Sequence, residues 1–546
     1  MTSTELLYIP YRNPNPGQPS AESRQKHAAR EYHRKRRLSK VQVSSRRAAN
    51  PSNINAKRSN ASAEKALQHS TIAQDTLNTP TASPTAVALP HHPDILGKWR
   101  LDPFNALHSE HLPDFVQEML DHGIPLTYTA IRYQWALYAP SRKDAVHTQN
   151  AIMTSAMKSP VAFYSIIFAG ACHYAFLQRN LNISKESVVL RMSYKTQALT
   201  SLRNELEQCQ GVVTEEVLLS IILLAIHDKG DTLVAPKKLM DSPLRQVKDN
   251  EFYTSMRWQP KHLDMLFAML KQLGGLQSLR MHGLAEAIES TALNESLLAL
   301  EPPRVSLLHP ASYYLKPCQQ KWDAEGRERH KTVSARKFAL LDGAEGKELL
   351  SQTIADTRKL LVTYECFRRN RVNGPDLLQT IGARRSIQWN LQRQLPSNDC
   401  RYRVCRYAML IFLVETIHPK PRYLDIHRRL AEKLMLALDE ASMLGYTNKC
   451  PEDYAWASIL GGAAASETSL DEWYRAQMSS SCGFVFDEDW ESVKSMLSSF
   501  LVPGAEHEER CKRFWHEARE YYLERQGTKY WDPPTDTSEV WSSPDS

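Results

Sequence analysis

Hydrophobic residues downstream of Trp99 recur at steps of three, four and seven residues, which is the spacing of one face of an α-helix. One such face is predicted within a helix over 185–208 by Met192, Leu199, Leu202 and Leu206. The run 217–226 is apolar on all sides, which predicts an enclosed helix, and Thr214 is suited to cap its first turn. Alternating strand patterns closed by Asn-Gly or Asp-Gly hairpin turns are essentially absent. The sequence therefore predicts an all-α body.

A second well-marked helix is predicted after a polar loop over 229–258. Pro260 is suited to start it, and Gly274-Gly275 to end it. Its inner stripe is predicted to consist of Leu263, Leu266, Leu270 and Leu273. Further helices are predicted over 284–300, 345–368, 402–417, 423–444, 490–501 and 506–526.

The segment 161–177 raises the question of a membrane span, because it holds 17 residues without a formal charge. That length is at the lower limit of the roughly 17 to 25 residues that cross a bilayer. Ser165, His173 and Tyr174 would lack hydrogen-bond partners in hydrocarbon, whereas a protein core can supply them. We therefore expect a buried core helix and no contact with a membrane.

Aromatic residues separate the chain into two parts. Of the 47 Phe, Trp and Tyr residues, only Tyr8, Tyr11 and Tyr32 precede Trp99. Too few apolar residues remain in that part to offset the entropy of folding. We predict that 1–98 is disordered, with a basic arm over 24–58 and a Ser/Thr/Pro-rich linker over 59–98. A helical domain is predicted over 99–531 and a disordered tail over 532–546.

Charge follows the same division. Residues 24–58 contain twelve Lys and Arg and one acid, Glu31, a net charge of +11, whereas the whole chain of 546 residues carries +7. Subtracting one from the other leaves −4 for all remaining residues. The basic character therefore belongs to the arm and not to the helical body.

The arm is the sharpest candidate for a functional segment. If 22–37 is helical, Lys26, Arg30, Arg34 and Arg37 form one positive stripe that is able to contact phosphates. Arg34-Lys35-Arg36-Arg37 also fits a nuclear-import signal that a carrier reads by its charge. A basic zipper is not predicted, because Leu38 is followed at seven-residue steps by Ser45 and Ser52. The same arm could also be no more than a solvated tail.

Metal and cofactor motifs are not found. The nine cysteines include no Cys-x-x-Cys pair, so we expect free thiols in a reducing, intracellular compartment and no zinc site. Met1 to Pro10 does not resemble a secretory leader. Phosphate-loop, dinucleotide-binding, His-Glu-x-x-His and Gly-x-Ser-x-Gly motifs do not occur, and Gly461-Gly462 is interpreted as a site of close helix packing. The protein is predicted to be no enzyme and to need no cofactor.

One catalytic alternative remains open. His173, His227-Asp228 and Asp264 look like the His…His-Asp…Asp ligand pattern of the HD-type phosphohydrolases, in which a divalent metal ion activates water. The simpler interpretation is that His227 ends a helix and interacts favourably with its dipole.

The order of several segments resembles the fungal-specific transcription-factor family in its second form, which lacks the zinc cluster. The basic arm and linker are followed by Leu101-Asp102-Pro103-Phe104, by the helices near 202–206 and 217–226, and by 262–266 leading to Leu273-Gly274-Gly275-Leu276. The resemblance implies a nuclear, all-helical regulatory domain. In that family the residues corresponding to His262 and Gly274-Gly275 are structural.

Our leading hypothesis is a nuclear transcriptional regulator with a helical regulatory and protein-interaction domain. The expected contacts of its arm are Lys26, Arg30, Arg34, Lys35, Arg36 and Arg37, which would bind a nuclear-import carrier and, as a further expectation, DNA without sequence preference. Other transcription regulators are expected partners of the body. A nuclear scaffold that does not bind DNA is the remaining alternative.

Overall fold

The computed structural model describes residues 138–141, 143–177, 185–208, 212–227, 258–393 and 398–529. These residues form helices joined by turns and contain no β-strand, so the predicted all-α class is confirmed for the described part of the chain. All of them belong to one compact unit, 91–546. The predicted arm, linker and tail lie outside the described residues.

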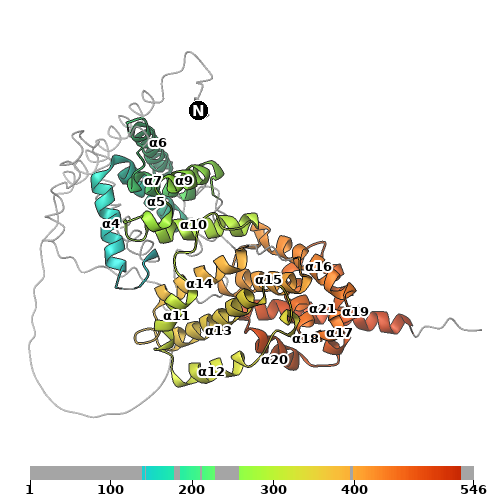
Figure 1. The fold of residues 1–546 in the computed structure, drawn as a ribbon. Helices are drawn as coiled ribbons and strands as arrows, with labels where there is room; N and C mark the ends of the chain where they lie inside the picture. The colour runs from blue at the N-terminus through green and yellow to red at the C-terminus, as the bar shows by residue number, and fades with distance from the viewer. Residues whose placement is uncertain are drawn as a thin grey trace, which may run out of the picture. The chain divides into compact units, whose positions relative to one another are not determined.

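Most buried hydrophobic side chains belong to two large clusters, and Figure 1 shows how the helices around them are arranged. The first cluster is enclosed by the helices of the N-terminal half: α4 (Ala145–Lys158), α5 (Pro160–Leu177), α6 (Lys185–Gln208), α7 (Glu215–His227), α9 (Pro260–Gln272), η4 (Leu276–Ser278) and α10 (Leu284–Ala299). Among the described helices, none is long and apolar enough to cross a membrane.

Helix α7 has the enclosed environment that its sequence predicts. Every residue from Val217 to His227 is buried. The hydroxyl oxygen of Thr214 accepts a hydrogen bond from the backbone N–H of Val217 at 3.3 Å, which satisfies one free donor of the first turn. The Glu215 carboxylate accepts the backbone N–H groups of Arg280 and Met281 at 2.8 and 2.6 Å, and so ties the start of α7 to the loop before α10.

Helix α9 also begins and ends where the sequence predicts. It starts at Pro260, and its buried face contains Leu263, Leu266 and Leu270. Gly274 and Gly275 have φ angles of 94° and 89°, in the region that a side chain disfavours. The Gly275 N–H donates to the carbonyl of Leu270 at 2.9 Å, which closes the last turn.

The predicted inner face of α6 is confirmed at Leu202 and Leu206, which lie at the first cluster, and wrong at Met192 and Leu199. Met192 is 42% exposed and Leu199 is 38% exposed, whereas the buried stripe consists of Arg191, Tyr194, Ala198 and Leu202. The helix carries apolar residues on two sides, and periodicity alone does not decide which side meets the core. Tyr194 buries more apolar surface than Met192 would, and the aliphatic stem of Arg191 packs along the same side.

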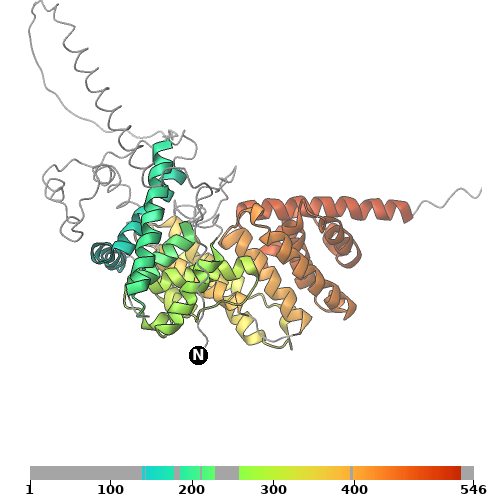
Figure 2. The ribbon, with the colours of Figure 1, turned by 90° about the horizontal axis from the view of Figure 1, so that it is seen from above.

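The second cluster is enclosed by the helices of the C-terminal half (Figures 1 and 2). These are α11 (Ala311–Gln319), α12 (Ala324–Ser334), η5 (Ala339–Leu341), α13 (Lys347–Arg369), α14 (Leu377–Gln392), α15 (Cys400–Phe412), the π-helical turn η6 (Leu413–Ile417), η7 (Arg422–Leu424), α16 (Ile426–Met443), α17 (Tyr446–Lys449), α18 (Pro451–Ala465), α19 (Asp471–Ser481), η8 (Gly483–Phe486), α20 (Trp490–Phe500) and α21 (Ala505–Lys529).

The helices predicted over 284–300, 345–368, 402–417, 423–444, 490–501 and 506–526 correspond to α10, α13, α15 with η6, α16 with η7, α20 and α21. Helices α11, α12, α14, α18 and α19 were not predicted. Gly461 and Gly462 on α18 allow the close packing that the sequence suggests. A Cβ atom at Gly461 would lie 2.4 Å from the ring of Tyr474, and one at Gly462 would lie 2.1 Å from the ring of Phe514.

Arginine side chains hold the ends of several helices. Arg422 donates to the carbonyls of Ala463 and Ala464 at the end of α18, at 3.0 and 2.6 Å. Arg429 does the same for Leu298 and Ala299 of α10. Further pairs join Arg406 to Leu391 and Gln392, and Arg358 to Phe500. Each guanidinium supplies donors to free carbonyls at the negative end of a helix dipole.

Helix α14 joins the two clusters. It packs against α10 on one side and against α11, α13 and α15 on others. The amides of Gln388 and Gln392 both donate to the Leu293 carbonyl of α10, at 3.1 and 3.0 Å. The junction therefore contains polar side chains inside the protein.

Candidate functional site

The candidate residues of the arm lie outside the described residues. Lys26, Arg30, Arg34, Lys35, Arg36 and Arg37 therefore remain predictions from sequence.

The residues of the phosphohydrolase alternative lie in different environments. The His227 imidazole is buried, and its Nδ1 interacts with the Leu223 carbonyl at 2.7 Å. Burial lowers the pKa of His227 to about 4, so the ring is neutral at pH 7. The Asp264 carboxylate is 65% exposed and binds Arg304 at 2.7 Å. Asp228 and the side chain of His173 are outside the described residues.

The cysteines among the described residues form no disulfide bond. They are Cys172, Cys318, Cys366, Cys400, Cys405, Cys450, Cys482 and Cys511. Burial raises the pKa of several of them, including that of Cys318 to about 11, which disfavours the reactive thiolate. Within the described ranges, no three His, Cys, Asp or Glu side chains come together as a metal site.

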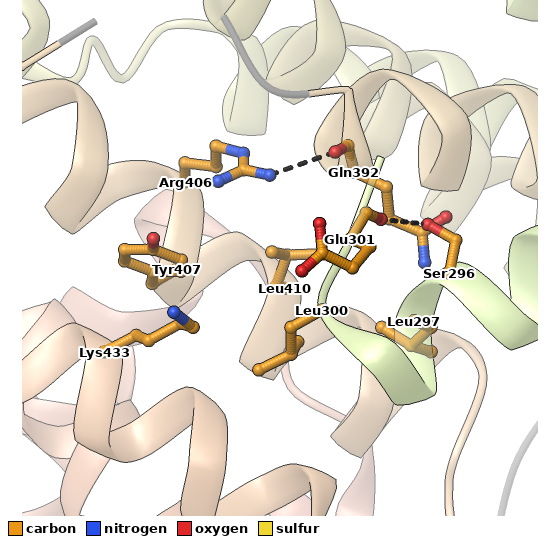
Figure 3. A pocket seen from close by; sticks show the side chains of 9 residues that line it. All are labelled: Ser296, Leu297, Leu300, Glu301, Gln392, Arg406, Tyr407, Leu410 and Lys433. Carbon is orange, nitrogen blue, oxygen red and sulfur yellow. Dashed lines mark hydrogen bonds between the residues drawn. The ribbon is translucent and has the colours of Figure 1, made fainter. Parts of the chain in front are cut away.

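A small surface pocket lies where α10, α14, α15 and α16 meet (Figure 3). Its lining is mixed and contains Ser296, Leu297, Leu300, Glu301, Gln392, Arg406, Tyr407, Leu410 and Lys433. Arg406 is held by its bonds to the carbonyls that end α14. The free volume of about 30 Å³ suits a few water molecules and is too small for a cofactor.

The turn that follows α15 carries the most unusual chemistry of the described residues. The segment 408–417 is apolar except for Glu415 and Thr416, and its last turn is π-helical. The His418 N–H donates to the Leu413 carbonyl at 2.7 Å, which is the wide bond of a π-turn. Pro419 and Pro421 have no N–H and prevent a regular helix from continuing. This turn presents Glu415, His418 and Lys420 to the interior.

Glu415 is the centre of a buried polar cluster in which one carboxylate pairs with two guanidinium groups. Its carboxylate is fully buried and forms ion pairs with Arg510 of α21 and, at 2.9 Å, with Arg422 of η7. His427 of α16 lies 3.6 Å from the same carboxylate, and Thr416 binds His507 Nδ1 at 2.8 Å. We call Glu415, Arg422, His427, His507 and Arg510 the Glu415 cluster.

The pKa values in the Glu415 cluster describe which charges exist at neutral pH. Burial alone would raise the pKa of Glu415, but the neighbouring His427 and the guanidinium groups of Arg422 and Arg510 lower it to about 2. Burial lowers the pKa of His427 and of His507 to about 4. At pH 7 a carboxylate therefore faces two guanidinium groups and two neutral imidazoles.

A second buried cluster lies at the α10–α14 junction. Lys420 Nζ donates to Asn294 Oδ1 at 2.9 Å, and His418 Nε2 lies 3.3 Å from the same oxygen. Arg384 of α14 is 5% exposed and close enough for its charge to lower the pKa of both His418 and Lys420, in addition to burial. We call Arg384, His418, Lys420 and Asn294 the Arg384 cluster. The adjacent Arg385, in contrast, is paired with the buried Glu289 at 3.5 Å.

Sequence reasoning missed both clusters. The signal for the first was present, because Glu415 is the only charged residue in the apolar run 408–417, and an isolated carboxylate in such a run requires buried cations. The Arg384 cluster gave no comparable signal. Two consecutive arginines in 377–392 are typical of an exposed helix, and their partners lie far away in the sequence.

No family model, no curated protein and no solved structure matches the chain. The resemblance to the fungal-specific transcription-factor family therefore remains a prediction from the sequence.

Proposed function

We propose that this protein is a nuclear transcriptional regulator in which a basic arm directs nuclear import and an all-α body serves regulation and protein contacts. The observation that carries the proposal is the separation of charge. Residues 24–58 carry +11 and the remainder of the chain −4. A short, strongly basic segment beside a weakly acidic body is typical of a segment read by its charge, by an import carrier or by nucleic acid.

The all-α architecture of the described residues supports the same proposal, because the family resemblance implies a helical regulatory domain. The described thiols, pockets and buried histidines give no specific support to a catalytic function. Asp264 in particular forms an exposed ion pair with Arg304.

The import function is tested with the full-length, fluorescently tagged protein. Changing Arg34, Lys35, Arg36 and Arg37 together to Ala should abolish its accumulation in the nucleus, because the carrier binds through these charges. The matched control removes four exposed basic residues of the body, Lys316, Lys337, Arg368 and Arg371, and should leave accumulation unchanged. Nuclear enrichment that persists in the arm variant would contradict the proposal.

DNA contact by the arm is tested by measuring affinity against salt concentration. If the arm binds phosphates, log affinity falls linearly with log salt concentration, with little dependence on DNA sequence, and the arm variant binds more weakly with a shallower slope. If the wild-type protein binds no DNA but still enters the nucleus, the scaffold alternative is favoured. A salt-insensitive, sequence-selective complex would place DNA recognition outside the arm.

A further inference from the structure

Buried charges in the described helices almost always have partners. Arg385 faces Glu289, and Glu415 faces Arg422 and Arg510. The guanidinium groups of Arg358 and Arg406 donate hydrogen bonds to backbone carbonyls. These pairings are what burial demands, because an unpaired charge inside a protein costs several kcal/mol.

The Arg384 cluster departs from this rule. Arg384, His418 and Lys420 are 5%, 4% and 2% exposed. No carboxylate among the described residues interacts with any of the three, and the groups that perturb Arg384 are Tyr364, Arg385 and Tyr138. A guanidinium, an amine and an imidazole are thus enclosed together, and the amine and the imidazole share one neutral polar partner, the amide of Asn294.

Several hydrogen-bonding atoms at this place are also unused. Arg384 Nε and Nη1, Tyr364 Oη and His418 Nδ1 are all buried without a hydrogen-bond partner among the described residues. Lys420 Nζ uses one of its three protons on Asn294. Arg384 comes from α14, Tyr364 from α13, Asn294 from α10, and His418 and Lys420 from the turn after η6. Helices α13 and α14 and the turn after η6 therefore bring unused donors to one enclosed position.

We propose that the Arg384 cluster binds the phosphate group of a small ligand. A guanidinium offers two parallel N–H donors that match the oxygens of a phosphate, and an ammonium adds a second positive charge. A phosphate dianion balances Arg384 and Lys420 together, whereas a single carboxylate would leave one charge unbalanced. Because Asn294 Oδ1 only accepts, His418 holds its proton on Nε2, which leaves its Nδ1 to accept a hydrogen bond from the one P–OH of the inorganic phosphate dianion. This inference is independent of the basic arm.

The test uses the full-length protein, dialysed free of phosphate, and inorganic phosphate as the probe. The thermal midpoint is measured over a range of phosphate concentrations at constant ionic strength, with acetate as the monoanionic comparator. Phosphate should raise the midpoint by about 3 °C at about a hundredfold excess over its dissociation constant. Acetate should produce a clearly smaller rise.

Variants test whether the phosphate-dependent rise in the thermal midpoint comes from the Arg384 cluster. Arg384→Met should lose the phosphate-dependent rise, and Lys420→Met provides a second variant if the first folds poorly, as judged by its helix content. Arg371→Met and Lys316→Met remove the same side chains from exposed positions and should respond as the wild type does. The proposal is overturned if phosphate leaves the wild-type midpoint unchanged, if acetate matches its effect, or if the folded cluster variants respond equally.

Discussion

The Glu415 cluster and the Arg384 cluster both include residues of the segment 415–420, yet they differ in whether their buried charges face groups of opposite charge. Glu415 faces two guanidinium groups and two imidazoles, drawn from η7, α16 and α21. Three and five residues later, His418 and Lys420 face Arg384 and no carboxylate among the described residues. The first cluster pairs its carboxylate with cations of the same chain and so ties η7, α16 and α21 to the turn after α15. The second has the composition of a site that an anion from outside would complete.

The largest effect is expected from removing the charge at the centre of the Glu415 cluster. Glu415→Gln keeps the shape of the side chain but leaves Arg422 and Arg510 without a carboxylate in a buried place. We expect the free energy of unfolding, measured in urea, to fall by about 3–5 kcal/mol. The control is Glu432→Gln, which breaks an exposed ion pair with Arg428 and should cost less than about 1 kcal/mol. Equal losses in both variants would refute the role assigned to Glu415.

The next largest effect is expected from lowering the pH, which should reduce the stability that the Glu415 cluster contributes. The folded protein holds His427 and His507 with pKa values of about 4, below the usual 6.5, so the unfolded state binds more protons between these values. Stability from these groups is complete above pH 6.5 and is lost as the pH falls towards 4. Asp453 acts against them, since burial raises its pKa to about 6. For His427, His507 and Asp453 together we expect a loss of about 2 kcal/mol between pH 6.5 and 5, and His227, which burial also keeps neutral, adds to it.

The variant His507→Asn isolates one part of this pH dependence. Its amide can replace the contact of Nδ1 with Thr416 and does not titrate. The free energy of unfolding of the variant should fall less steeply with acid, by about 1.4 kcal/mol per pH unit at most. If both proteins show the same slope between pH 6.5 and 5, His507 does not remain neutral in the fold.

A smaller effect should follow from separating α21, which supplies His507 and Arg510 to the Glu415 cluster, from α18. Gly462→Ala places a methyl group against the ring of Phe514, between α18 and α21. We expect a loss of about 1–3 kcal/mol from overpacking, measured by thermal or urea unfolding. Gly445→Ala is a useful contrast, because that position has open space but a φ of +75°, so its cost is conformational and not steric. No loss at Gly462 would mean that the ring shifts freely.

The sequence predicted those parts of the fold whose causes are local. Helices α7 and α9 were predicted with their caps, because Thr214, Pro260 and Gly275 act within a turn of their own positions. The buried side of α6 was predicted correctly at Leu202 and Leu206 and wrongly at Met192 and Leu199, because the choice between its two apolar sides is made by neighbouring helices. Helix α14 was not predicted, because two consecutive arginines, Arg384 and Arg385, are typical of a solvent-exposed helix face.

For the candidate sites too, the sequence predicts what is local and does not predict which distant residues come together. An isolated Glu415 in an apolar run indicates a buried ion pair, but it does not say that Arg510, 95 residues later, supplies the cation. The Arg384 cluster depends on packing of α10, α13, α14 and the turn after η6, which no local pattern records. The arm is the reverse case, since its charge is evident from sequence and its residues lie outside the described structure.

The difference between the two clusters is tested most directly by measuring the free energy of unfolding of Glu415→Gln and Lys420→Met in the same phosphate-free buffer at pH 7. Burial keeps the pKa of Lys420 well below its usual value, so its replacement by an apolar side chain of similar size relieves a cost. We predict opposite signs: Glu415→Gln lowers the free energy of unfolding, and Lys420→Met raises it by about 1–3 kcal/mol. A loss of similar size in both variants would contradict the account, because it would mean that Lys420 already has its counter-charge within the chain.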